Sequence, residues 1–159
     1  MINKIKLTWQ DIEHCVDILA NKLNDKKFDA VVSIGRGGMI PARLLAEKFD
    51  IHNAYIIDAK AYGENVISFN AANNNINVKV SEINFASNIH NVLVVDDCIF
   101  TGATLAVVIN KIKENKQIEH ITNVFLYKNE HVQNVFNKYL YAKSYDGNTN
   151  WLVFPWEKN

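Results

Sequence analysis

The chain has 159 residues, with 17 basic side chains balanced by 17 acidic ones, and 48% of its residues are hydrophobic. A chain of this length is expected to form one domain that buries roughly two-thirds of its unfolded surface. Its formal net charge of zero gives no general attraction to nucleic acid or to an anionic membrane, so we expect neither as a partner.

Cysteine usage and hydropathy indicate the compartment. The two cysteines, Cys15 and Cys98, are too few and too far apart for a disulfide framework or a zinc site, which favours a reducing environment. No apolar run approaches the roughly 18 residues that span a bilayer, and the N-terminal residues lack the apolar segment of a signal peptide. We therefore expect a cytoplasmic protein.

The first 50 residues give a helix, a strand and a second helix. Apolar residues from Trp9 to Leu23 recur at steps of three and four, which predicts an amphipathic helix with Thr8 as its N-cap. Residues 30–34 form a short β-branched run that ends at Gly35, as expected for a strand buried on both faces. A helix from about Met39 to Lys48 follows, with a proline in its first turn.

The rest of the chain continues the alternation of strands and helices. The predicted elements are a strand at 54–59, a strand at 92–95, a helix over Leu105–Ile112, a strand at 120–127 and an aromatic C-terminal segment at 151–156. The polar stretch 60–90 interrupts this order and forms either a mobile lid or a poorly ordered hairpin. Composition alone does not choose between the two.

Strands that alternate with helices through short glycine turns predict parallel pairing with right-handed crossovers. The expected fold class is therefore α/β, a single domain over residues 1–159 with an open parallel sheet and helices on both faces. Ligands of such sheets bind beyond the carboxyl ends of the strands. The glycine-containing turns at 35–38 and 98–104 both lie at that edge, which makes it the candidate site.

Two adjacent carboxylates, Asp96 and Asp97, follow the strand at 92–95. Such a pair is costly unless it binds sugar hydroxyls or a hydrated divalent metal, for which carboxylates suit Mg²⁺. The stretch Thr101–Thr104 then supplies hydroxyls and consecutive N–H groups at a helix N-terminus, where a phosphate is the natural occupant. The simpler alternative is that Asp97 begins a turn and Thr101 caps the helix.

The other turn combines three glycines with one arginine. Gly35, Gly37 and Gly38 leave several N–H groups without side-chain obstruction, and the guanidinium of Arg36 can bind a phosphate in bidentate fashion. A pyrophosphate would fit such a loop. The loop is a weak signal by itself, and its coexistence with the acidic stretch makes the pair informative.

These motifs together resemble a known family. The run Val92–Asp97 followed by Thr101–Leu105 is similar to the phosphoribosyl pyrophosphate signature of the type I phosphoribosyltransferases. The resemblance covers nearly the whole chain, since it also includes Thr8 with the first helix, the glycine loop through Arg43, Phe125–Lys128, and the ending Asn150–Glu157. The last segments in this order resemble the short xanthine-guanine and hypoxanthine branch.

The resemblance implies that a ribose 5-phosphate group is transferred from phosphoribosyl pyrophosphate to a purine base, with magnesium, giving a nucleoside monophosphate and pyrophosphate. It places Asp96 and Asp97 on the ribose diol, and on the metal directly or through water, and Arg36 on the departing pyrophosphate. These three are the implied catalytic residues. The implied phosphoribosyl pyrophosphate site comprises Gly35, Arg36, Gly37, Gly38, Asp96, Asp97, Phe100, Thr101, Gly102, Ala103 and Thr104.

The family also implies a base site, a hood and an assembly. The base-binding residues that the resemblance implies are Ile99, Phe100, Lys128, Trp151 and Leu152. The lysine would bind the 6-oxo group and the tryptophan would stack on the base. A C-terminal segment at about 145–157 would complete the site. A solvated lysine and a core tryptophan are the structural alternatives. The hood at about 60–90, with Lys60, Tyr62 and Gly63, would exclude water. Dimers or tetramers are what the family suggests.

One position departs from the family pattern. Oxopurine enzymes carry an aspartate near N7 of the base where this chain has Phe100, and a positioned acid or base contributes about 10²- to 10⁴-fold. Three explanations compete. Asp58 or Glu64 substitutes for it, the preferred base differs, or the protein binds phosphoribosyl pyrophosphate with little turnover.

Three functions follow from these alternatives. The first is a purine phosphoribosyltransferase that uses guanine, xanthine or hypoxanthine. The second is a catalytically weak regulator that binds phosphoribosyl pyrophosphate or a nucleotide on the same fold, which Phe100 favours. The third, a nucleic-acid-binding regulator, predicts a concentrated basic face, and the interspersed Lys and Glu residues of 111–119 do not suggest one.

Overall fold

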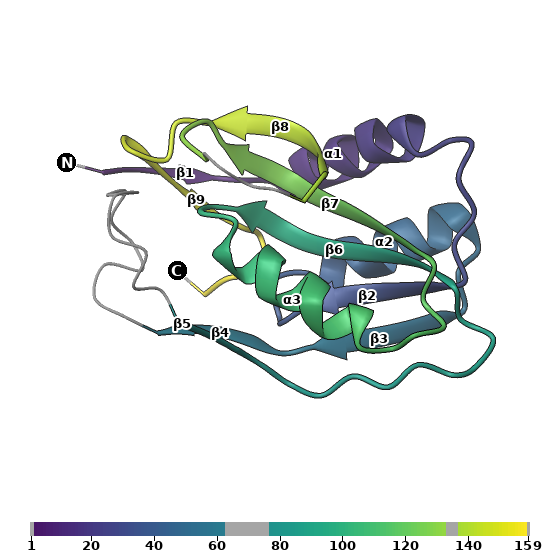
Figure 1. Cartoon of the computed structure of the whole chain (residues 1–159). Helices are drawn as coiled ribbons and strands as arrows, with labels where there is room; N and C mark the ends of the chain where they lie inside the picture. Colours follow the sequence, from purple (N-terminus) through teal and green to yellow (C-terminus); the bar gives the residue numbers. More distant parts are fainter. Residues whose placement is uncertain (1, 63–76, 133–136, 159) are drawn as a thin grey trace.

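A computed structural model describes residues 2–62, 77–132 and 137–158 of the chain. Five parallel strands form the central sheet, in the order β3-β2-β6-β7-β8. Their bounds are Ala30–Ile34 for β2, Asn53–Ile57 for β3, Asn91–Ile99 for β6, His120–Asn129 for β7 and Leu140–Tyr145 for β8. Figure 1 shows these strands side by side, with helices in front of and behind them.

Helices cover both faces of this sheet. The helices α1 (Trp9–Lys22) and α2 (Met39–Phe49) share one buried cluster with Leu93 and Val95 of β6. The helix α3 (Ala103–Lys113) packs with Val92 and Val94 on the opposite face. Successive side chains of β6 therefore enter different cores, which is why residues 92–95 of this strand are all apolar. The predicted fold class, an open parallel sheet with helices on both faces, is confirmed.

The first helix begins where the sequence predicts. The hydroxyl of Thr8 accepts a hydrogen bond from the Asp11 N–H, and the Asp11 carboxylate accepts one from the Thr8 N–H at 2.8 Å. This reciprocal arrangement is a capping box, which satisfies two N–H groups at the helix start. The pairing also lowers the pKa of Asp11. No helix in the described ranges is long and apolar enough to cross a membrane.

Two small strand pairs flank the main sheet. The strand β1 (Asn3–Lys6) pairs in parallel with β9 (Asn150–Val153), and β4 (Ala59–Tyr62) pairs antiparallel with β5 (Asn77–Val80). Apart from Ala59, the β4–β5 pair lies within the polar stretch 60–90 and gives the described part of that stretch an antiparallel strand pair. The strand expected at 54–59 is instead two strands, because β3 ends at Ile57 and β4 begins at Ala59.

The strand β6 is longer than its apolar pattern predicts. It continues through Asp96, Asp97 and Cys98 to Ile99, because its pairing with β7 continues to Lys128. The acidic pair is therefore part of a strand and not of the loop that follows. The carboxyl ends of β2 and β6, the first turn of α3 and the β8–β9 connection all lie at the same edge of the sheet (Figure 1).

Candidate active site

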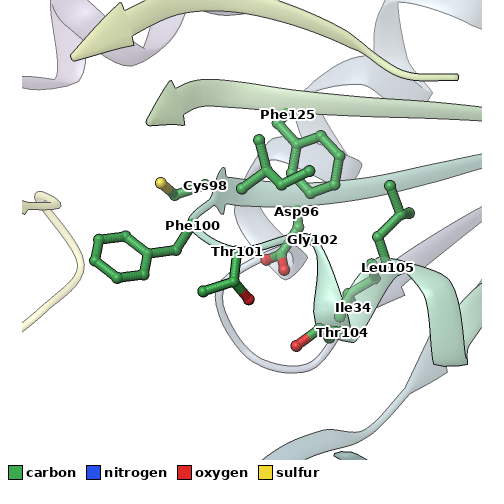
Figure 2. Close-up of a pocket in the computed structure, with 10 residues that line it drawn as sticks. Ile34, Asp96, Cys98, Phe100, Thr101, Gly102, Thr104, Leu105 and Phe125 are labelled. Carbon is green, nitrogen blue, oxygen red and sulfur yellow. The ribbon is translucent and has the colours of Figure 1, made fainter. Parts of the chain in front are cut away.

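The two carboxylates of β6 line different cavities. Asp96 lines a cavity of about 130 Å³ together with Thr101, Thr104 and Ile34 (Figure 2). Asp97 lines a neighbouring cavity of about 260 Å³ on the side of the C-terminal segment. Adjacent residues of a strand point to opposite faces, which explains this division. The pair can therefore serve two adjoining binding spaces at one edge of the sheet.

Both carboxyl groups are held in an unfavourable setting for negative charge. Burial, with repulsion from Asp97, raises the pKa of Asp96 well above its usual range, although the Asp97 N–H donates a hydrogen bond to Asp96 Oδ1 at 2.9 Å. Burial and the charge of Glu157 raise the pKa of Asp97 to about 6. Neither carboxylate has an ion-pair partner within the described ranges. A cation or hydroxyl groups from a ligand would relieve this cost.

The glycine loop offers free N–H groups beside an exposed guanidinium. Gly35 has φ +53°, and its N–H donates to the Ile57 carbonyl at 2.8 Å, while Gly38 donates to the Ile34 carbonyl at 3.2 Å. The N–H groups of Arg36 and Gly37 have no hydrogen-bond partner among the described residues. These two N–H groups, with the exposed Arg36 side chain, can receive an anion.

The same loop packs directly on the acidic strand. A Cβ added to Gly37 would lie 2.5 Å from Asp97 Oδ2, and one added to Gly38 would lie 2.3 Å from the Val95 carbonyl oxygen. Such separations are far below contact distance, so both positions require glycine for close approach. The predicted anion loop and the predicted acidic pair are thus in contact.

The third part of the site is the start of α3. Gly102 is the N-cap with φ +82°, and no side chain caps this helix. The Ala103 N–H donates to Thr101 Oγ1 at 3.3 Å. The Thr101 hydroxyl therefore stabilises the turn from the residue before the N-cap, and not from the N-cap position itself. The first N–H groups of α3 and the side chains of Thr101 and Thr104 adjoin the smaller cavity, which suits a phosphate.

Four of the eight described residues that line the larger cavity are aromatic. Its lining residues are Asp97, Cys98, Phe100, Tyr145, Trp151, Leu152, Phe154 and Glu157. The rings of Phe100 and Trp151 lie 6.5 Å apart at their centroids with their planes inclined by 60°. Figure 2 shows the Phe100 ring pointing away from Asp96 and Thr104. A flat heterocycle fits this aromatic lining better than a sugar does.

Two predicted base-site residues lie elsewhere in the structure. Ile99 is buried and lines the smaller cavity. Lys128 lines neither cavity, because its ammonium lies over the Tyr141 ring, 5.3 Å from the centroid. Their assignments to the base stay predictions.

The hood residues are only partly described. Lys60 lies in β4 and is exposed, Tyr62 ends that strand, and Gly63 lies outside the described residues. Of the two carboxylates offered as substitutes for the missing aspartate, Asp58 lines neither of the two cavities, and Glu64 also lies outside the described residues.

Three residues that line the larger cavity from the C-terminal part of the chain were not among the predicted site residues. Tyr145 comes from the end of β8, a strand that the sequence did not predict, and Phe154 and Glu157 come from the C-terminal turn. The Phe154 N–H donates to Glu157 Oε2 at 2.8 Å, which fixes the carboxylate near the cavity. Their only sequence signal is their position in the C-terminal segment at 145–157.

The comparison with known proteins agrees with this geometry. Residues 3–157 match the model of the phosphoribosyl transferase domain. The chain belongs to this family. Xanthine-guanine phosphoribosyltransferases of Cereibacter sphaeroides and Desulfotalea psychrophila are 26% and 27% identical to it, over 95% of this chain and 85% and 84% of theirs. A purine phosphoribosyltransferase structure from Pyrococcus horikoshii is 29% identical with a TM-score of 0.78, covering 98% of this chain and 95% of its own.

The acidic pair of this phosphoribosyltransferase provides a donor set that suits magnesium. Asp96 and Asp97 provide hard oxygen ligands whose charge nothing in the described ranges neutralises, and these suit Mg²⁺. The described residues contain no group of three metal-ligating side chains. Two carboxylates are enough for an ion that keeps several waters and is bound mainly by substrate phosphates.

Proposed function

We propose that this protein transfers ribose 5-phosphate from phosphoribosyl pyrophosphate to a purine base. The C1–O bond to pyrophosphate breaks, a bond from a ring nitrogen of the base to C1 forms, and the proton of that nitrogen is lost to solvent. The observation that carries the proposal is that an anion loop contacts an unneutralised acidic pair, one member of which lines a cavity together with an uncapped helix start. Family membership over residues 3–157 supports it.

Each part of the site has one task in this reaction. The N–H groups of Arg36 and Gly37 and the guanidinium bind the leaving pyrophosphate. The start of α3 holds the 5-phosphate at the smaller cavity, with hydroxyls from Thr101 and Thr104. Asp96 and Asp97 accept hydrogen bonds from the ribose hydroxyls, and their negative charge stabilises the positive charge that develops at C1. Positioning supplies much of the remaining catalysis.

Magnesium, held by Asp96 and Asp97 and by substrate oxygens, would neutralise charge on the pyrophosphate as it leaves. The buried carboxylates do not need a protein cation for this purpose. Their raised pKa values would fall once the ion and the ribose are bound, so both remain ionised during the reaction.

The base would occupy the larger cavity, where the rings of Phe100 and Trp151 form part of the lining. Among the described residues, the lining contains the carboxylates of Asp97 and Glu157 and no lysine or arginine. Hydrogen-bond donors on the base are therefore favoured over negative charge, and among the oxopurines this favours guanine over xanthine, which ionises more readily. Lys128 would reach the 6-oxo group only after leaving the Tyr141 ring.

A second candidate function rests on Phe100. Its ring lines the base cavity and carries no acid or base to assist proton transfer at the purine. A regulator that binds phosphoribosyl pyrophosphate or a nucleotide with little turnover is consistent with this side chain. Tight binding without transfer to any base would favour it.

A panel of bases tests the proposal. The protein, Mg²⁺ and phosphoribosyl pyrophosphate are mixed with guanine, xanthine, hypoxanthine or adenine, and pyrophosphate is measured. We expect release above background with at least one base and none for the combined Asp96→Asn and Asp97→Asn variant. An Asp25→Asn variant, altered at an exposed residue after α1, serves as the control. Unchanged turnover in the double variant would contradict the ribose assignment.

A further inference from the structure

A buried amide at the end of β7 connects three separate loops. Asn129 is fully buried, and its Nδ2 donates to the Phe100 carbonyl at 3.4 Å. Its Oδ1 accepts from the N–H of Gly147 at 3.1 Å and from the N–H of His131 at 3.2 Å. The three partners follow β6, follow β7 and lie between β8 and β9, respectively. One side chain therefore joins segments that are far apart in the sequence.

The orientation of this amide is determined by its partners. One end faces two N–H donors and the other faces a carbonyl oxygen, so only the carboxamide satisfies both. Aspartate would retain the acceptors and would place a negative charge beside the Phe100 carbonyl. A Cβ on Gly147 would lie 2.6 Å from Asn129 Nδ2, so the turn also requires glycine for the amide to fit.

A second set of contacts stabilises the turn between β8 and β9 that contains Gly147. His131 Nε2 lies 2.8 Å from Asp146 Oδ1, an oxygen that also accepts the N–H of Asn148. Asp146 Oδ2 accepts the hydroxyl of Thr149 at 2.8 Å. These bonds close the turn that leads into β9, and they attach it to the end of β7 beside Asn129. The pKa of Asp146 is lowered by the same partners.

The loops that Asn129 joins are those that carry the two aromatic walls of the base cavity. Phe100 lies on the first, and Trp151 follows the turn on β9. The strand β1 pairs with β9 in a register that places Lys4 opposite Trp151. Asn129 supplies a separate connection, between the loop that carries Phe100 and the turn that contains Gly147.

We infer that Asn129 is a positioning residue that sets the separation of Phe100 and Trp151 and thereby the fit of the acceptor base. This inference rests on the proposed function, because it assigns the aromatic cavity to the base. Asn129 lines neither cavity, so it acts through the loops that it joins. The bond to Phe100 is the longest of the three and, by its length, the weakest.

Amide hydrogen exchange tests whether this connection exists. In Asn129→Ala we expect the N–H groups of Gly147 and His131 to exchange at least about tenfold faster, since each loses its acceptor. The matched control is Asn123→Ala, which removes another buried amide from β7, one that donates to the Lys138 carbonyl at 2.9 Å near the opposite end of the strand. Equal exchange at Gly147 in the wild type and in Asn129→Ala would overturn the inference.

Ligand binding tests the consequence for the base. Calorimetry compares guanosine monophosphate with ribose 5-phosphate, which differ by the base. We expect Asn129→Ala to weaken the nucleotide about tenfold and ribose 5-phosphate less than twofold, and Asn123→Ala to weaken neither selectively. If Asn129→Ala does not fold, Gly147→Ala displaces the same amide and is expected to give the same selective loss.

The two possible failures give different results. A wild-type protein that binds ribose 5-phosphate but no purine nucleotide contradicts the proposed function, and the base-positioning role of Asn129 falls with it. A wild-type protein that prefers the nucleotide, beside variants that weaken both ligands equally or neither, contradicts only the role assigned to Asn129.

Discussion

Removing the charge of Asp97 is expected to stabilise the protein when no ligand is bound. Burial and the charge of Glu157 raise its pKa from 3.8 to about 6 in the folded state. The unfolded chain therefore releases this proton more readily than the folded protein does. The stability contributed by the protonated form of Asp97 is fully present below about pH 4, and it is lost as the pH rises through about 6 and the carboxyl group ionises. Above that pH the charge destabilises the fold.

The size of this effect follows from the shift. A displacement of about two pKa units corresponds to about 3 kcal/mol, and partial exposure of the side chain to solvent reduces this to roughly 1–3 kcal/mol. For a chain of this length the unfolding midpoint of Asp97→Asn should rise by about 2–12 °C at pH 8. The Asp97 carboxylate accepts a hydrogen bond from the Cys98 N–H, and the side-chain oxygen of asparagine can accept the same bond. The substitution therefore loses little hydrogen bonding.

Urea unfolding between pH 5 and pH 8, without ligand or metal, measures this difference. We expect the stability gain of Asp97→Asn over the wild type to grow from pH 5 to about pH 7 and then to level off. The exposed residue Asp25 provides a control, since Asp25→Asn should change stability by less than about 0.5 kcal/mol at any of these pH values. If Asp97→Asn were less stable than the wild type at pH 8, the carboxylate would be a structural group and not one held for a ligand.

Three further predictions concern the loops and the base. Gly37→Ala places a Cβ 2.5 Å from Asp97 Oδ2 and should weaken phosphoribosyl pyrophosphate binding at least about tenfold in a calorimetric titration, with the fold retained because a side chain can move. Gly38→Ala places its Cβ 2.3 Å from the Val95 carbonyl oxygen and should reduce folded yield, which circular dichroism would detect. Phe100→Asp should raise turnover with hypoxanthine at least about tenfold by adding a general acid or base, and steady-state rates that stay equal or fall would count against this role. The kcat/KM for guanine should exceed that for xanthine, increasingly so as the pH rises, because Asp97 and Glu157 line the cavity.

The central strands could be predicted because both of their faces are buried. Residues 92–95 are all apolar, and residues 30–34 are apolar except for Ser33; this pattern follows from helices on both sides of the sheet. The strand β1 gives no such signal, since its four residues are all exposed and its partner β9 lies at the other end of the chain. The strand β8 mixes polar and aromatic residues, and only its register with β7 identifies it.

The anion loop and the acidic pair could be predicted from local motifs, whereas only part of the lining of the larger cavity could be predicted. Gly35 to Gly38 and Asp96 to Thr104 are continuous stretches whose chemistry can be read directly from the residues. The cavity is assembled from three distant segments, so Tyr145 and Glu157 become its lining only after β8 and the C-terminal turn are placed. Asn129 has even less local signal, because its role depends on three loops that meet in space.

Formation of the nucleotide itself tests the central claim most directly. The purified protein is incubated with Mg²⁺, phosphoribosyl pyrophosphate and a single purine base, and the nucleoside monophosphate and pyrophosphate are quantified from the same sample. Transfer predicts that the two products appear in equal amounts with at least one base, and that neither forms with Asp96→Asn combined with Asp97→Asn. Tight binding of phosphoribosyl pyrophosphate, without nucleotide from guanine, hypoxanthine, xanthine or adenine, would contradict the claim and identify a regulator.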